Sequence, residues 1–219
     1  PAFPMPALQY SKCEKTINEV QDNGRIITAD LAIIWITETD LEVIARYYKW
    51  ESAICKNVMF AEKAYLPRWF TDYVYECYAN KCTGKGGDPV LYSIKKSVVN
   101  SLYGMTVQKP VRDDITEDYE SGFYEKMPVN YEEKYSKYLE NRGSVLPYTV
   151  GVWCTAYAFR NLFDLGSCAG LWLYSDTDSC YATKFDEKKI SAYNEKCKKL
   201  LSDHGYSGVT VKGKEYNLG

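Results

Sequence analysis

Two aspartates with one threonine between them stand between two short apolar runs near the end of the chain. The stretch at 171–182 reads LWLYSDTDSCYA. β-prone residues flank turn-forming ones, so the pattern predicts a β-hairpin whose tip carries Asp176 and Asp178. Two neighbouring carboxylates repel each other unless a cation neutralises them. Because magnesium accepts one or two carboxylates together with substrate phosphates, the spacing points to a nucleotide-phosphate site.

Two other interpretations of Asp176 and Asp178 remain open. A polar turn needs no metal, because Asp, Thr and Ser side chains bond to nearby backbone amides. A calcium loop of the helix-loop-helix type would take the two aspartates as its first and third positions and Glu187 as its twelfth. That loop needs an oxygen ligand at the fifth position and glycine at the sixth, where this chain has Cys180 and Tyr181. Calcium is therefore the weakest of the three interpretations.

A second set of residues suited to phosphate chemistry lies upstream on a predicted helix. Asp88 as N-cap and Pro89 at the first helical position mark its start. Lys96, Asn100 and Tyr103 recur at i, i+4 and i+7, so they share one face. A lysine can neutralise a triphosphate, and a tyrosine ring can pack against a base or sugar. The alternative is a solvated face with a buried tyrosine.

Another helix is expected just before it, over residues 67–81, because proline is tolerated in a first turn and apolar residues recur at helical spacing. The glycine-rich break at 83–87 lacks the spacing of a phosphate-binding P-loop and is expected to join two antiparallel helices. The second helix is predicted to end at Gly104. Two stripes of the first helix are expected to face the core more often than a nucleic acid; they are Trp69-Tyr73-Glu76 and Phe70-Val74-Cys77.

The first part of the chain is expected to be scaffold, since it carries no recognisable chemistry. Residues 1–12 are proline-rich and should be extended, and β-branched residues at 24–37 favour one or two strands. A short helix at 41–48 would be capped by Thr39 or Asp40. Its buried face is expected to consist of Leu41, Ile44 and Ala45.

Composition limits the remaining possibilities. The 219 residues have a formal charge of −2 at pH 7, which argues against bulk affinity for nucleic acid and leaves only local basic patches for such contacts. The eight cysteines form no C-x-x-C pair and are expected to be reduced core residues. The single histidine, His204, argues against Ser-His and Cys-His catalysis. No apolar run reaches membrane-spanning length and no signal peptide is visible. The chain begins with Pro1, so we expect an interior piece of a longer protein.

The two motifs together resemble family B DNA polymerases. Residues 96–104, of the pattern K-x-x-x-N-S-x-Y-G, are similar to the fingers motif of that family, and residues 174–179 are similar to its palm motif Y-x-D-T-D-S, in the same order. The segment between them resembles the protein-primed branch of phages and linear plasmids, which carries an insertion there that helps to grip the terminal-protein primer and to separate strands.

The resemblance implies an α+β fold, with a polymerase palm of antiparallel sheet and helices, two-helix fingers and an inserted terminal-protein region. Residues 1–66 would be a palm-associated insertion or scaffold, and residues 67–104 the fingers. Residues 105–146 would form a second insertion, and residues 147–219 the palm with the catalytic hairpin.

The resemblance also implies roles for individual residues. Asp178 would be the principal carboxylate that binds both catalytic metals, and Asp176 would shape the metal site. Lys96 would contact the incoming triphosphate. Asn100 and Tyr103 would line the nascent base pair and the floor that selects the sugar.

Further phosphate and DNA contacts follow from the same resemblance. Lys81, favoured over Lys85, would be a second phosphate-binding lysine near the tip of the fingers. DNA contacts are implied for Ser101, Gly104, Thr155 and Arg160. The family often has arginine directly after its T-A-aromatic-A run, where this chain has Phe159 and then Arg160. One residue is a rotation of about 100° on a helix, so this contact departs from the family pattern.

The implied activity is that of a DNA-directed DNA polymerase, which transfers a nucleotidyl group from a deoxynucleoside triphosphate to a primer hydroxyl with two Mg²⁺ or Mn²⁺ ions. Its partners would be template and primer DNA, deoxynucleoside triphosphates and a terminal-protein primer, and it would act without a membrane, as a monomer, in the cytoplasm of an infected or plasmid-bearing bacterial host.

The alternative is a catalytically incomplete piece that only binds nucleotide or DNA. We assign no residues to the family's upstream D-x-x-S-L-Y-P motif or to its downstream K-x-Y motif; Asp30 and Asp40 lack the Ser and Tyr-Pro that should follow. We therefore expect no polymerisation from this chain alone.

Overall fold

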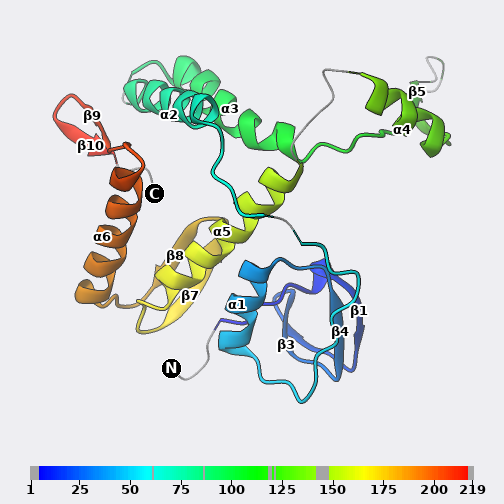
Figure 1. Cartoon of the computed structure of the whole chain (residues 1–219), viewed down its shortest axis with the longest axis horizontal. Coiled ribbons are helices and arrows are strands. Elements are labelled where there is room, and N and C mark those ends of the chain that lie inside the picture. Colours follow the sequence, from blue (N-terminus) through cyan, green and yellow to red (C-terminus); the bar gives the residue numbers. More distant parts are fainter. Residues whose placement is uncertain are drawn as a thin grey trace.

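Small antiparallel sheets alternate with helices around a central helix, α5 (Figure 1). The computed structural model describes residues 5–60, 62–85, 87–117, 120, 122–141 and 148–216. Within these residues each strand pairs with one other strand, so the sheets are two-stranded. The fold is thus a mixture of helices with short hairpin-like sheets.

The N-terminal part contains four short strands. β1 pairs with β4 and β2 pairs with β3, both antiparallel. The strands expected at 24–37 are confirmed as β3 and β4. Of the start expected to be extended, residues 1–4 lie outside the described residues, and the expectation is wrong for Tyr10–Lys12, which form a 3₁₀ turn. The bounds are Cys13–Ile17 for β1, Val20–Asp22 for β2, Arg25–Thr28 for β3 and Leu31–Ile34 for β4.

Helix α1, Glu38–Tyr47, begins earlier than the sequence pattern predicts. Its N-cap is Thr37, not Thr39 or Asp40. The Thr37 hydroxyl accepts from the Asp40 amide at 3.2 Å, and the Asp40 carboxylate accepts from the Thr37 amide at 2.9 Å. This reciprocal capping box satisfies two backbone donors at once, which explains why the helix starts there.

A hydrophobic core cluster joins α1 to α5. It consists of Ala7, Val43, Ile44 and Phe163. The expected burial of Leu41 and Ala45 is wrong, because α1 turns Val43 and Ile44 toward α5 and leaves those two exposed. The Arg46 guanidinium also pairs with the Asp164 carboxylate at 2.6 Å.

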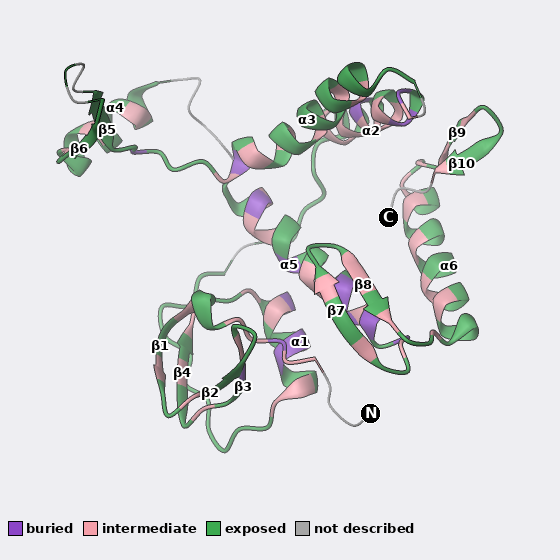
Figure 2. Ribbon diagram, turned by 180° about the vertical axis from the view of Figure 1, so that it is seen from behind, coloured by how far each residue is buried: buried purple, intermediate pink, exposed green. Residues whose placement is uncertain are grey.

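Helix α5, Tyr148–Gly166, contacts α1, α3, α6 and strand β8 (Figure 1). Many of the buried residues lie along α1 and α5 (Figure 2). The Phe163 ring lies edge-on to the Tyr47 ring at 5.0 Å between centroids. Because it connects elements from both ends of the chain, α5 fixes where the candidate functional groups stand.

Helices α2, Arg68–Thr83, and α3, Pro89–Thr106, pack side by side and antiparallel (Figure 1). The predicted start of α3 is confirmed, since the Asp88 carboxylate accepts from the Val90 amide at 2.8 Å. The predicted end at Gly104 is wrong. The helix continues to Thr106, because Gly104 keeps a helical conformation with no left-handed turn.

The aromatic stripe of α2 divides into an inner and an outer face. Cys77 is buried and Phe70 and Val74 are half-buried, as predicted. Trp69 and Tyr73 are 73% and 48% exposed, so the prediction that their stripe faces the core is wrong. The packing of α3 on α2 therefore buries one stripe of α2 and leaves the other exposed to solvent.

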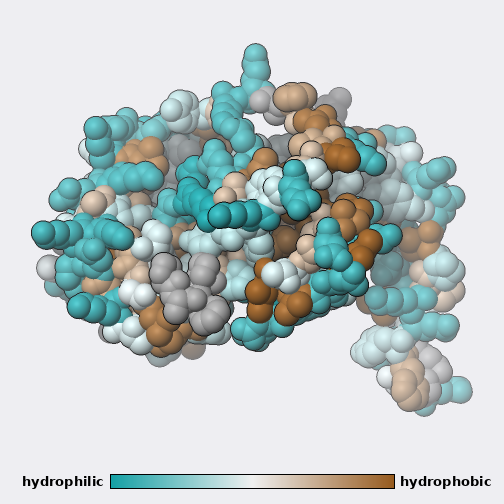
Figure 3. All heavy atoms as spheres, turned by 90° about the horizontal axis from the view of Figure 1, so that it is seen from below, coloured by the Kyte–Doolittle hydropathy of each residue, from teal (hydrophilic) through white to brown (hydrophobic). Residues whose placement is uncertain are grey.

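The remaining elements are two peripheral hairpins, a helix beside each, and the hairpin at 172–182. β5, β6 and α4 project away from the rest of the molecule (Figures 1 and 3). The bounds are Asp114–Glu117 for β5, Tyr124–Met127 for β6, Tyr131–Glu140 for α4, Trp172–Asp176 for β7, Ser179–Ala182 for β8, Glu187–Asp203 for α6, Val209–Val211 for β9 and Lys214–Tyr216 for β10.

Apolar side chains are interspersed with polar ones on the surface (Figure 3). All eight cysteines are free thiols; Cys77, Cys82 and Cys168 are buried as expected, whereas Cys55 and Cys154 are exposed and not core residues. None of the described helices is long and apolar enough to cross a membrane.

Candidate functional site

The predicted acidic hairpin is confirmed. β7 and β8 pair antiparallel with Asp176 opposite Ser179, so Thr177 and Asp178 form the two-residue turn. Thr177 has a φ of 49°, which a β-branched residue adopts only under strain. Its hydroxyl donates to an Asp176 carboxylate oxygen at 3.1 Å. Both carboxylates therefore stand at the exposed end of a tight turn.

The base of this hairpin rests on the core. The Trp172 ring lies edge-on to the buried Phe163 ring at 5.0 Å. Gly166 makes this approach feasible, because a Cβ there would lie 2.6 Å from an atom of the Trp172 ring and closer to two others. The Tyr174 and Tyr181 rings pair across the strands at 5.7 Å. The packed base of the hairpin thus supports its exposed tip.

The two carboxylates fit part of a magnesium site. Carboxylate oxygens are the hard ligands that Mg²⁺ prefers. The Thr177 hydroxyl occupies one oxygen of Asp176, whereas the Asp178 carboxylate has no hydrogen bond or ion pair within the described residues. Among those residues no group of three or more His, Cys, Asp and Glu side chains could hold a metal ion. Further ligands would have to be water, substrate phosphate or residues beyond this set.

Helix α3 carries the second predicted set. Lys96, Asn100 and Ser101 are exposed, and Tyr103 is 40% exposed. In the described part of the chain the side chains of Lys96, Asn100 and Tyr103 make no hydrogen bond or ion pair, so they are available to a ligand. The structure shows no interaction between this face and Asp176 or Asp178 within the same residues.

The two sets are related through α5, which contacts both α3 and β8. Gly151 lies where α3 meets α5. A Cβ at this position would stand 2.5 Å from the Thr106 hydroxyl oxygen and still closer to a Val107 methyl group. The close approach of α3 to α5 therefore depends on the missing side chain. Gly104 has open space around it and is not needed for packing.

The lysines near the tip of α2 lie over aromatic rings. Lys81 Nζ is 5.3 Å from the centre of the Tyr78 ring, and Lys85 Nζ is 4.1 Å from the centre of the Tyr216 ring. Burial, followed by a hydrogen bond with Cys82, raises the pKa of Tyr78 to about 12. That tyrosine therefore stays neutral beside Lys81 at physiological pH.

The residues of α5 predicted to contact DNA make side-chain contacts within their own helix. The Thr155 hydroxyl donates to the Val152 carbonyl at 2.8 Å. The Arg160 guanidinium lies 4.8 Å from the centre of the Tyr157 ring. Arg160 Nε is buried without a hydrogen-bond partner among the described residues, an uncommon state for a charged group.

The expectation that no residues match K-x-Y is wrong. Residues 214–216, which form β10, read Lys-Glu-Tyr and follow the acidic hairpin as the pattern requires. The tripeptide is short and common, so its position after the acidic hairpin was the signal that could have found it.

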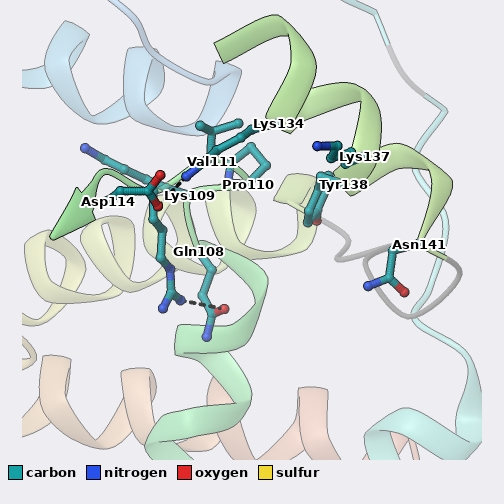
Figure 4. A pocket seen from close by; sticks show the side chains of 10 residues that line it. Gln108, Lys109, Pro110, Val111, Asp114, Lys134, Lys137, Tyr138 and Asn141 are labelled. Carbon is teal, nitrogen blue, oxygen red and sulfur yellow. Dashed lines mark hydrogen bonds and ion pairs between the residues drawn. The ribbon is translucent and has the colours of Figure 1, made fainter. Parts of the chain in front are cut away.

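A basic hollow of about 450 Å³ lies where the segment after α3 meets α4 (Figure 4). Lys134 pairs with Asp114, and Lys137 with Glu133 at 2.6 Å. The cationic residues that line the hollow are Lys109, Arg112, Lys134 and Lys137. The sequence places Lys109 and Arg112 in the expected insertion but does not predict the hollow, because the packing of residues 108–114 against α4 depends on tertiary contacts.

A row of stacked tyrosines runs along α4 beside this hollow. The rings of Tyr131 and Tyr135 stack at 5.8 Å, and those of Tyr135 and Tyr138 at 6.3 Å. Their spacing at i, i+4 and i+7 was the sequence signal for a shared face.

Comparison with protein families matches residues 5–142 to the family described as DNA polymerase type B, organellar and viral. The match includes α2, α3 and the candidate residues from Lys81 to Gly104, and it ends before the acidic hairpin. No curated protein and no solved structure matches the chain.

Proposed function

Because the chain belongs to the organellar and viral type B DNA polymerases, we propose that it carries the nucleotide-binding and part of the metal-binding machinery for nucleotidyl transfer to a primer hydroxyl. The observation that carries the proposal is the exposed Asp176-Thr177-Asp178 turn, held on a packed hairpin downstream of the matched segment.

Asp178 and Asp176 would hold Mg²⁺, with Mn²⁺ as a substitute. Bound there, the ions would lower the pKa of the primer hydroxyl and neutralise charge on the leaving pyrophosphate. Asp178 is the better ligand, because both its carboxylate oxygens are open, whereas Asp176 already accepts from Thr177.

The α3 face would bind the nucleotide. Lys96 is an exposed cation suited to the triphosphate, and Lys81 or Lys85 would add a second positive charge from α2. The Tyr103 ring would pack against the sugar and base, and the Asn100 amide would bond to polar groups of the nascent pair. Since a phosphoryl-transfer site acts mainly by positioning and charge neutralisation, these contacts are the kind it needs.

Residues 105–146 would form an insertion that contacts a terminal-protein primer or the DNA, as in the protein-primed polymerases of phages and linear plasmids. Support comes from the basic hollow and the stacked tyrosines of α4, since cations bind phosphate and exposed rings stack on bases. The residues Ser101, Gly104, Thr155 and Arg160 would contact template and primer.

A catalytically incomplete nucleotide- or DNA-binding module is the second candidate. The described residues supply two carboxylates but no third metal-ligating side chain nearby, which favours binding without turnover in this chain by itself. Primer extension distinguishes the two: extension that Asp178→Asn abolishes supports the enzyme, and binding without extension supports the module.

The direct test is Mg²⁺-dependent binding of a deoxynucleoside triphosphate to the chain with primer–template DNA, measured by calorimetry. Asp178→Asn should weaken it at least tenfold and leave DNA affinity unchanged. The matched control is Asp22→Asn, an exposed aspartate at the end of another strand. Equal affinity of the Asp178→Asn variant and the unchanged chain would contradict the metal-binding role.

A further inference from the structure

Arg68, the first residue of α2, links that helix to the turn that follows α6. One guanidinium nitrogen donates to the His204 carbonyl at 2.7 Å. Nε pairs with the Asp72 carboxylate at 2.9 Å. The guanidinium plane also lies 4.7 Å from the centre of the Tyr206 ring. Arg68 thus makes three contacts of different kinds, two of them to residues far away in the sequence.

Tyr206 completes this cluster from the opposite side. Its hydroxyl lies 2.6 Å from the Thr71 hydroxyl and 2.8 Å from an Asp72 carboxylate oxygen. Its ring lies 5.3 Å from the Tyr75 ring. We call Arg68, Asp72 and Tyr206, with the Thr71 hydroxyl, the α2–α6 node.

Local structure aims Tyr206 at α2. Gly205 has a φ of +78°, the left-handed conformation that ends many helices. The Tyr206 amide donates to the Leu201 carbonyl at 2.9 Å and the Gly205 amide to the Ser202 carbonyl at 2.9 Å. These paired bonds close the end of α6 and fix the direction in which Tyr206 leaves it.

The Arg68–Asp72 pair alone would contribute little, since both side chains are more than half exposed. The node differs from an isolated surface pair because one arginine and one tyrosine hydroxyl share the same carboxylate. Ordering one side chain therefore orders the others.

A second contact joins the same two parts of the chain at the far end of α2. Lys85 Nζ lies over the Tyr216 ring of β10 at 4.1 Å, and α2 also contacts β9. Helical rise puts the two ends of α2, Arg68 and Thr83, about 22 Å apart, and Lys85 lies in the turn just beyond Thr83. The segment from α6 to β10 therefore holds α2 near both ends.

We propose that Arg68 and Tyr206 are positioning residues for nucleotide binding by the α2–α3 pair. This rests on the function proposed above. The hairpin that carries Asp178 leads through residues 183–186 into α6, the node joins the turn after α6 to α2, and α3 packs on α2. The node therefore connects the acidic turn to the Lys96 face by a route separate from α5. Neither Arg68 nor Tyr206 needs to touch the nucleotide.

The test compares Tyr206→Phe with Tyr75→Phe in the full chain. Tyr206→Phe keeps the ring contacts and removes only the hydroxyl that reaches Thr71 and Asp72. Tyr75→Phe also removes one hydroxyl from a neighbouring ring, but within the described residues that hydroxyl makes no hydrogen bond. Hydrogen–deuterium exchange of residues 68–83 and the Kd for Mg²⁺–deoxynucleoside triphosphate are measured for each variant.

We expect Tyr206→Phe to speed exchange in the first turns of α2 at least threefold and to raise the triphosphate Kd three- to tenfold, with the Kd for primer–template DNA unchanged. Arg68→Lys should give an intermediate effect, because lysine keeps the charge and loses the stacked, forked guanidinium. Tyr75→Phe should match the unchanged chain in both measurements.

Two negative results have different meanings. If the unchanged chain binds triphosphate and Tyr206→Phe binds it equally well, the positioning role is wrong and the proposed function stands. If the unchanged chain binds no triphosphate at all, the proposed function fails and the positioning role fails with it.

Discussion

Replacing Gly151 with alanine tests how closely α3 must approach α5. A Cβ at Gly151 meets Thr106 and Val107, and neither neighbour yields easily. Thr106 is buried and its hydroxyl donates to the Tyr103 carbonyl at 2.7 Å. Val107 is β-branched and stiff about its first side-chain torsion. Gly104, in the interior of α3, provides the matched control, because a Cβ added there would have nothing within 4 Å apart from its chain neighbours and the backbone of its own helix.

The two substitutions should differ in their effect on the free energy of unfolding. Alanine is favoured over glycine in a helix by about 1 kcal/mol, and this gain applies in some measure to both. Adding a methylene-sized group to a packed contact costs about 1–3 kcal/mol. We therefore expect Gly104→Ala to stabilise by roughly 0.5–1 kcal/mol, and Gly151→Ala to be less stable than Gly104→Ala by about 1–3 kcal/mol.

Urea unfolding followed by circular dichroism measures this difference. A change of about 1 kcal/mol shifts Tm by about 2–4 °C in a chain of this size, so thermal scans give an independent check. Gly151→Ala should also accelerate hydrogen exchange at the end of α3 without affecting α1. If the two variants have equal stability, or Gly151→Ala is the more stable, the close-packing argument is refuted.

Three more predictions concern single side chains. Asp88→Ala removes the N-cap of α3 and should cost about 1 kcal/mol, measured by urea unfolding; no loss would show that the cap is dispensable. Tyr48→Phe removes a hydroxyl that donates to a backbone carbonyl at 2.6 Å and accepts from a backbone amide at 3.0 Å. It should lower the free energy of unfolding by about 1–3 kcal/mol, and a smaller loss would mean that water replaces the hydroxyl. Burial is the largest cause that raises the pKa values of Tyr78 and Tyr193, each to about 12. Because the folded state holds these protons more tightly, their contribution to stability is complete below about pH 10 and is lost as pH rises toward 12. Absorbance at high pH should show that Tyr78 and Tyr193 ionise later than exposed tyrosines, and uniform ionisation of all tyrosines would contradict this.

The features that the sequence predicts well are those fixed by neighbours in the chain. The acidic hairpin needs only β-prone runs around a turn, and the start of α3 needs only Asp88 before Pro89. The two antiparallel helices follow from apolar periodicity interrupted by glycines. Each of these is decided within a few residues, so no tertiary information is required.

The features that the sequence predicts poorly depend on distant parts of the fold. Glycine at position 104 favours a helix end, yet packing carries α3 past it. The spacing of Trp69 favours a core face, but the narrow helix pair does not provide one. Tyr206 gives no signal at all, since its partners on α2 lie far upstream. The site residues on α3 and at the hairpin can be named from motifs. Their arrangement in space cannot be predicted in this way, because it depends on the contacts of α5 with α3 and β8.

The connection between α1 and α2 determines where a protease should cleave the chain. Its described residues, 48–60 and 62–67, form no helix or strand, and Phe60 and Tyr65 are 94% and 85% exposed. A protease that cuts after aromatic residues should nick the chain here first. The two pieces would nevertheless stay together, because α1 packs on α5 through the buried core and the Arg46–Asp164 ion pair. Co-expressed as separate polypeptides, they should reassemble by complementation, so covalent continuity at this connection is not needed to hold the fold together.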